Sequence, residues 1–191
     1  MSTIQTTGQP AAQAATFTYN IDPTHSNAHF KVRHLMIAWV RGEFTKVGGT
    51  ITINDADHTL SSITAEIDVS SISTREPDRD KHLLSPDFLH SADHPVIKFQ
   101  STKVAKDGED EYNVTGNLTI RGVTHPVVLE VDSVTPEIKD PWGFFRRGAA
   151  ATTKISRKEF GVTFNQFLET GGVAVGDEVQ ISIDVELVRQ A

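Results

Sequence analysis

The chain has 191 residues, of which 38% are hydrophobic and 23% are charged, a composition that suits one globular domain with enough core to fold without cross-links. It contains no cysteine, which excludes disulfides, thiolate metal sites and cysteine nucleophiles. The formal net charge is −7 and the sequence has no basic stripe, so we expect no nucleic-acid partner. No stretch is long or apolar enough for a transmembrane segment.

The first sixteen residues are small and polar, and they contain neither a basic start nor an apolar run. This pattern predicts a flexible N-terminal tail at 1–16 without a signal peptide, followed by one domain at 17–191. Taken as it stands, the chain is expected to be cytoplasmic, or periplasmic if a leader has been removed.

Period-two alternation of apolar and polar residues is the dominant signal, and it is clearest at 63–69, 112–120 and 179–187. Because alternate side chains of a strand point to opposite faces, each run has one buried face and one wet face, which is typical of antiparallel sheet. Turns rich in Asp, Asn and Gly separate the runs, for example at 106–110 and 121–124.

These runs predict eight strands and a ninth near the C-terminus. The expected ranges are 17–22, 26–34, 42–53, 60–70, 96–104, 111–120, 126–136, 145–156 and 177–188. Strands with one apolar face and little helix to cover them must bury that face on each other, in a sandwich or in a closed barrel. Short consecutive hairpins favour an up-and-down meander, but periodicity alone leaves both architectures open.

Small residues at positions expected to face inward bear on what a barrel could hold. They are Ala65, Gly116, Gly148 or Ala149, and Ala151. An eight-stranded barrel is near the size at which side chains either fill the interior or leave room for one ligand. Small inward residues favour room.

One segment is expected to be helical. Pro77 suits the first position of a helix, and Asp78 favours the first turn. Ser85 and Pro86 end the helix and favour a second short turn after it. The sequence therefore predicts one short helical segment near 77–90.

Several short blocks then occur in a fixed order along the chain. They lie at 19–26, 30–35, 41–44, 48–51, 70–74, 79–84, 87–89, 95–101, 116–126, 155–162 and 175–179. No block is specific by itself. The ordered set covers about residues 17–188 and resembles the YceI-like family of lipocalin-like, polyisoprenoid-binding proteins.

The resemblance implies an all-β fold, an antiparallel eight-stranded up-and-down lipocalin-like barrel with an amphiphile in its pore. The implied function is binding and transport or storage of a long-chain isoprenoid-like or fatty amphiphile, with no enzyme activity and no cofactor other than this lipid. The resemblance also suggests a homodimer. The alternative is a stress-related interaction protein whose barrel is filled by its own side chains and holds no ligand.

A pocket for a long amphiphile needs apolar walls and a few polar groups near the head group. The candidate wall residues are Phe30, Leu35, Ile37, Trp39, Phe44, Ile67, Leu83, Leu84, Phe88, Phe99 and Leu118. The candidate head-group residues are His34, Arg79, Asp80 and His82, because an arginine can hold a phosphate through paired donors. Arg79 and Asp80 can instead be a pair on the surface of the helix. Each wall residue can instead be an ordinary core residue.

The run at 35–40 is continuously apolar, which is unusual in a half-wet strand. It is equally consistent with a pocket mouth, a dimer surface or a helical turn.

Histidines at 25, 29, 90 and 94 are too scattered to predict a metal site. Asp22, His25 and Ser26 have the residue types of a catalytic triad, but neighbours in one turn rarely meet its geometry, so we expect turn chemistry instead.

Overall fold

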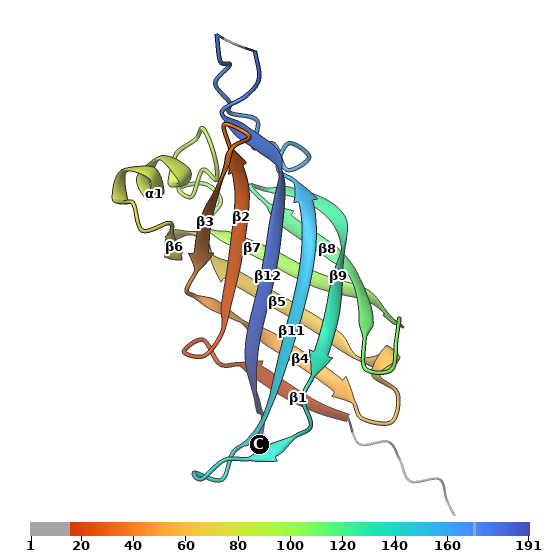
Figure 1. The fold of residues 1–191 in the computed structure, drawn as a ribbon. Helices are drawn as coiled ribbons and strands as arrows, with labels where there is room; N and C mark the ends of the chain where they lie inside the picture. The colour runs from red at the N-terminus through yellow and green to blue at the C-terminus, as the bar shows by residue number, and fades with distance from the viewer. Residues whose placement is uncertain (1–15, 170) are drawn as a thin grey trace, which may run out of the picture.

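A computed structural model of the chain describes residues 16–169 and 171–191, and antiparallel strands dominate it (Figure 1). The strands are β1 (Thr16–Ile21), β2 (Asn27–His34), β3 (Ala38–Phe44), β4 (Val47–Asn54), β5 (Ser62–Asp68), β6 (Ile72–Ser73), β7 (Val96–Lys106), β8 (Tyr112–Ile120), β9 (Val123–Val134), β10 (Ile138–Lys139), β11 (Phe145–Ser156) and β12 (Val175–Arg189). The predicted tail at 1–16 lies outside the described residues except for Thr16, which begins β1.

Eight of these strands close into a barrel. Around the ring they follow chain order, β1–β4–β5–β7–β8–β9–β11–β12, and β12 then pairs with β1. The ring is therefore an up-and-down meander, which confirms the expected architecture and decides between the sandwich and the barrel that periodicity left open.

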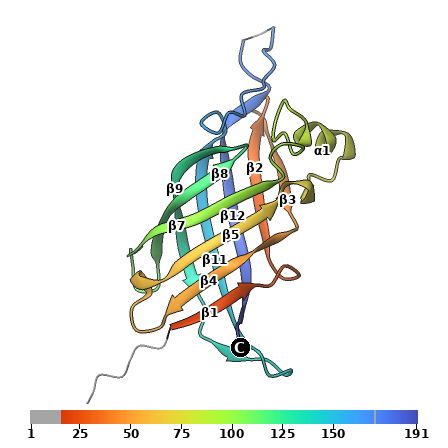
Figure 2. The same cartoon turned by 180° about the vertical axis from the view of Figure 1, so that it is seen from behind.

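The β2–β3 hairpin is inserted between the first two barrel strands, β1 and β4. One edge of β12 pairs with β11, while its other edge pairs with β1 near the C-terminus and with β2 over residues 175–184. Figure 2 shows the result from behind, with β1, β4, β5 and β7 running obliquely across β2, β12, β11 and β9. The hairpin thus extends the sheet beside β12 at one end of the barrel.

The strand predicted at 42–53 is wrong in one respect, because a bend divides it into two strands that run in the same sense. β3 ends at Phe44 and β4 begins at Val47. Between them, the Lys46 amide donates to the Ser71 hydroxyl at 3.1 Å and the Thr45 amide donates to the Ser71 carbonyl at 3.3 Å. This bend is held by a distant segment, so no local sequence signal marks it.

The one α-helix within 16–169 and 171–191, α1 (Pro77–Leu84), begins and ends where its sequence predicts. The Glu76 side chain accepts a hydrogen bond from the Asp78 amide, and the helix ends at Ser85, whose amide donates to the His82 carbonyl. Turns follow it up to His90, and two 3₁₀ turns, η1 (His58–Leu60) and η2 (Val69–Ser71), flank β5. No helix in the described residues is long and apolar enough to cross a membrane.

Not every small inward residue leaves free space. A Cβ atom at Gly116 would overlap the Phe99 ring and come within 2.6 Å of the Gln100 carbonyl oxygen. The expectation that Gly116 contributes room is therefore wrong, because the Phe99 ring already covers this backbone. Gly48, by contrast, has no heavy atom within 4 Å of such a Cβ.

We expect Gly116→Ala to lower the free energy of unfolding by about 1–3 kcal/mol, since the Phe99 ring must move to admit a methyl group. Gly48→Ala is the matched control, and its effect should stay within about 0.5 kcal/mol. Urea unfolding of the three proteins measures the difference. Equal stabilities for the two variants would show that the Phe99 ring is not packed against Gly116.

Candidate functional site: the internal cavity

An apolar cavity of about 320 Å³ lies inside the barrel, at the lower end of the range of small-molecule sites. All eight barrel strands contribute inward-facing residues to its wall. β12 alone lines it from Val175 to Leu187, a length of about 40 Å along an extended strand. The space is therefore long and narrow, and the barrel is not completely filled by its own side chains.

Seven of the fifteen predicted ligand-binding residues lie on this wall. They are Phe30, Phe44, Ile67, Leu83, Phe88, Phe99 and Leu118. Ala65, Ala149, Ala150 and Ala151 also line it, and their short side chains leave space that longer ones would fill.

The four head-group candidates do not line the cavity. Asp80 accepts a hydrogen bond from the Thr74 amide at 2.8 Å, and the Arg79 Nη2 donates to the Thr74 carbonyl at 2.9 Å. Both side chains therefore hold the segment that leads into α1. His82 is 2.8 Å from Asp87 through its Nε2, and His34 is exposed at the end of β2.

The apolar run at 35–40 is a tight hairpin turn followed by β3, so the helical-turn interpretation is wrong. The other two interpretations, a pocket mouth and a dimer surface, stay predictions. Leu35, Ile37, Trp39 and Leu84 are not part of the cavity wall. Trp39 lies on the outer face of β3, where the Arg33 guanidinium is 4.2 Å from its ring centroid.

Some wall residues are missing from the predicted set, although the alternating sequence pattern includes them. Ile181, Ile183 and Val185 alternate along β12, and the cavity is lined by all three. The prediction omitted them because period two shows which residues share a face without showing which face encloses space.

Arg157 is a buried cation on the cavity wall that sequence reasoning did not single out. Its Nε donates to the Gly176 carbonyl at 2.8 Å, and its Nη1 donates to the carbonyls of Val162 and Phe164 at 2.7 and 2.8 Å. Burial lowers the pKa of Arg157, and Asp177 lies 3.5 Å away. Because its donors are used by backbone carbonyls, Arg157 braces the connection between β11 and β12.

Aromatic rings gather where α1 and this connection meet the barrel. The Phe88 ring lines the cavity, with its centroid 5.0 Å from the His82 ring and 5.1 Å from the Phe164 ring. His82 and Phe164 are themselves 5.1 Å apart. The three rings make this end of the site apolar with one titratable group at its edge.

The end of the barrel at which β1 and β12 pair contains a buried polar group. The fully buried Tyr19 hydroxyl donates to Glu137 at 2.6 Å and accepts from the Arg147 Nε at 3.0 Å. Burial, followed by the hydrogen bond to Glu137, raises the pKa of Tyr19 to about 12. Arg189 adds an ion pair to Glu137 at 3.0 Å, so this end of the barrel is braced by charge.

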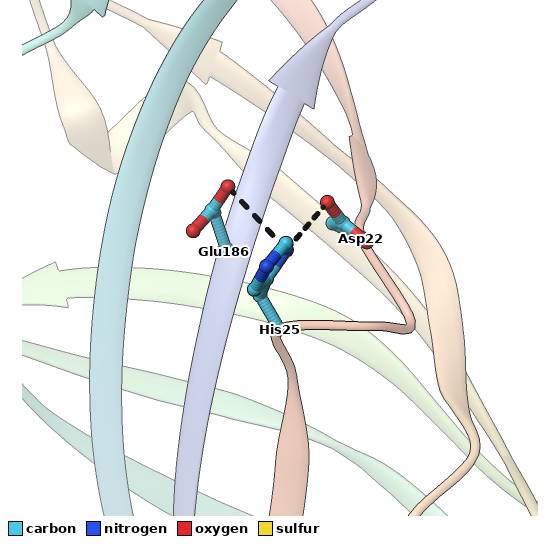
Figure 3. Close-up of side chains that lie close together, drawn as sticks. All are labelled: Asp22, His25 and Glu186. Atoms are coloured by element: carbon cyan, nitrogen blue, oxygen red, sulfur yellow. Dashed lines mark hydrogen bonds and ion pairs between the residues drawn. The ribbon is translucent and has the colours of Figure 1, made fainter. Parts of the chain in front are cut away.

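Asp22, His25 and Glu186 converge beside this end (Figure 3). The His25 Nδ1 is 3.0 Å from an Asp22 oxygen and 3.9 Å from a Glu186 oxygen. Arg146 contacts both carboxylates, at 3.0 Å for Asp22. A guanidinium therefore already supplies the positive charge that a metal ion would bring, and the cluster is better explained as a structural ion network.

The same network explains the triad-like residues in this turn. The Ser26 hydroxyl donates to the Glu186 carbonyl and is not hydrogen-bonded to His25, so the three side chains do not form a nucleophile–base pair. Hydrogen bonds from the Thr24 hydroxyl, His25 and Arg146 hold the pKa of Asp22 well below its usual range.

Because the pKa of Asp22 is depressed in the fold, its stabilising contribution is present above the ordinary aspartate pKa of about 4 and is lost as the pH falls below it. We expect Asp22→Asn to be less stable than the wild type at neutral pH and to lose less stability between neutral pH and acid. Urea unfolding across this range measures both. Asp107→Asn, in the exposed β7–β8 turn, is the control, and an equally flattened profile there would contradict the assignment to Asp22.

Comparison with known proteins bears on the whole chain. A model of the YceI-like domain matches residues 19–187. The chain belongs to the YceI-like family. The resemblance inferred from the ordered blocks is thereby confirmed. Protein YceI of Salmonella newport is 37% identical over 189 residues, covering 99% of this chain and 94% of the relative. A UPF0312 protein of Pectobacterium carotovorum is 37% identical over 180 residues, covering 94% and 90%.

Two solved structures of similar proteins superpose on the YceI-like barrel described above. BcnA of Burkholderia cenocepacia aligns with a TM-score of 0.76 and 25% identity, over 87% of this chain and 98% of that one. A polyisoprenoid binding domain from Saccharophagus degradans aligns with a TM-score of 0.66 and 14% identity, over 91% and 99%. At the latter identity the likeness concerns the fold alone.

Proposed function

We propose that this YceI-like chain binds a long-chain isoprenoid-like or fatty amphiphile inside its barrel, for transport or storage. The observation that carries the proposal is the apolar cavity of about 320 Å³ that β12 lines over nearly its whole length. Such a space suits a flexible hydrocarbon chain better than a compact polar metabolite, because its wall offers few hydrogen-bond partners. The Saccharophagus degradans domain described as polyisoprenoid binding shares this fold.

Binding is favoured over catalysis by the state of the polar groups on the wall. The Thr153 hydroxyl donates to the Val128 carbonyl at 2.7 Å, and the Arg157 donors are held by backbone carbonyls. The His58 ring is packed against the Tyr112 ring in a tilted arrangement, with the two centroids 5.3 Å apart. None of these groups is arranged as a nucleophile with an adjacent base, so no cofactor or reaction is part of the proposal.

Ala151→Phe tests the proposal by filling the cavity from β11. Ala151 lines the cavity opposite Ile183 of β12, so a phenyl ring there competes with the ligand for space. We expect at least about a tenfold loss in affinity for a fluorescent isoprenoid, which corresponds to roughly 1.4 kcal/mol. Lipid extracted from the purified variant and measured by mass spectrometry should fall with it.

Thr152→Phe is the matched control, because Thr152 is the next residue of β11 and is exposed. It should retain the wild-type affinity and the wild-type lipid content. Absence of any lipid from the wild type, together with no uptake of the fluorescent isoprenoid, would sink the proposal. Equal loss in both variants would show that the cavity is not where the ligand binds.

A further inference from the structure

The turn of the β2–β3 hairpin has a strained backbone, because its central residues are not the types that favour positive φ angles. Leu35 and Met36 have φ angles of 52° and 60°, and the Ile37 amide donates to the His34 carbonyl at 3.1 Å. This is the geometry of a type I′ turn, which ordinarily takes Asn or Gly at its two central positions. Each larger residue in this region costs about 1 kcal/mol. The chain therefore keeps large apolar side chains at two positions where Asn or Gly would make the turn more stable.

Leu35 is half-buried, whereas Met36 and the following Ile37 are turned towards solvent. Met36 is 58% exposed and Ile37 is 79% exposed. In the neighbouring connection between β11 and β12, Phe167 is 86% exposed. Leu35 ties the two segments together, because its amide donates to the Ala174 carbonyl at 2.8 Å. We call Met36, Ile37 and Phe167 the apolar tip. Figure 1 shows that both segments lie at the same end of the barrel.

The apolar tip lies just beyond one end of the cavity. Val32 and Val175 line the cavity, and His34, two residues after Val32, pairs with Val175 where β2 meets β12. A surface that received the tip would therefore face this end of the cavity. The apolar tip and the cavity wall are separated only by the last residues of the hairpin.

Basic side chains lie behind the tip on the outer face of the hairpin. Lys31 and Arg41 are opposite each other in the β2–β3 ladder, and Arg33 is opposite Trp39. The Trp39 ring has the Arg33 guanidinium 4.2 Å and the Lys31 ammonium 5.2 Å from its centroid. Among the described residues, no carboxylate lies within ion-pair distance of these three cations. Along the hairpin, the apolar tip is therefore followed by the amphipathic Trp39 and by three basic side chains.

The opposite end of the barrel carries exposed apolar residues with fewer free cations. In the hairpin that joins β10 to β11, Ile138 is 63% exposed, Trp142 is 78% exposed and Phe144 is 54% exposed. The arginines at this end are paired with carboxylates, Arg146 with Asp140, Arg147 with Asp55 and Arg189 with Glu137. Among the described residues, Lys139 is the cation of this hairpin without a carboxylate in ion-pair distance. Three such cations at the β2–β3 end against Lys139 here make the β2–β3 end the better match for an anionic partner.

We propose that the apolar tip inserts into the surface of an anionic phospholipid bilayer. Lys31, Arg33 and Arg41 then contact lipid phosphates while Trp39 sits at the level of the head groups, as expected of interfacial anchors. Docked in this way, the barrel presents one end of its cavity to the acyl chains. Exchange of an amphiphile between bilayer and cavity rests on the proposed function, but docking itself does not.

The first experiment measures cosedimentation with vesicles of phosphatidylglycerol and phosphatidylcholine. The wild type should bind them more strongly than vesicles of phosphatidylcholine alone. Met36→Ser combined with Ile37→Ser should weaken binding about tenfold, because interfacial affinity scales with buried apolar area. The matched control combines Ile138→Ser with Phe144→Ser at the opposite end and should bind as the wild type does. Lys31→Gln with Arg41→Gln should remove the preference for phosphatidylglycerol.

A second experiment keeps the tip intact and reports on its position. The chain has two tryptophans, so Trp142→Phe leaves Trp39 as the only one. Its emission should shift to the blue on vesicle addition and be quenched by brominated lipid.

No vesicle binding by the wild type, or equal loss in the control, overturns the proposal. The proposal is also overturned if the wild type forms a dimer on size exclusion and binds no vesicles, while the Met36→Ser, Ile37→Ser variant is a monomer. Retention of isoprenoid by the wild type in either case would leave the proposed function standing.

Discussion

The barrel is closed by its last strand, β12, which pairs with three other strands. β12 forms one long ladder with β11, and on its other side it pairs first with β2 and then with β1. Closure leaves the barrel strands without an open edge, so their inward faces can be apolar without a second layer to cover them. The cavity follows from this closure, because an eight-stranded ring is wide enough to retain space when its inward residues are small.

The two ends of the ring are built from different interactions. At one end, Tyr19 and the surrounding ion pairs fix the backbone with directed hydrogen bonds. At the other, Phe88 and Phe164 pack through apolar contact, and Arg157 holds a long connection by its carbonyls. Apolar contact is less directional than a hydrogen bond. The two ends are therefore fixed differently, by ion pairs around Tyr19 at one and by aromatic packing beside Arg157 at the other.

Sequence reasoning reached those features that depend on neighbours in the chain. Pro77 and Asp78 specify the start of α1 locally, and the alternation of β12 separates its buried face from its wet one. The choice of a barrel came from the ordered sequence blocks. The bend after Phe44 was missed because Ser71 holds it from a distance.

The candidate site was predicted less completely than the fold, for a related reason. Arg79 has the donors for an anionic head group and Asp80 lies beside it, yet Thr74 is hydrogen-bonded to both of them. Trp39 is apolar but faces outwards, since the turn at Leu35 and Met36 fixes the register of β3. Residue type shows what a side chain can do, whereas long-range pairing decides what it contacts.

The position of β12 in the chain also bears on biosynthesis. The strand that closes the ring is the last one to be made, and Tyr19 must wait for Arg189 before the two can pair. During synthesis, β1 and β11 therefore each keep one unpaired edge until β12 has left the ribosome. Pairing across such a sequence separation is slow, and open edges are sites of aggregation. Nascent chains of this protein should consequently depend on chaperones until the C-terminal strand emerges.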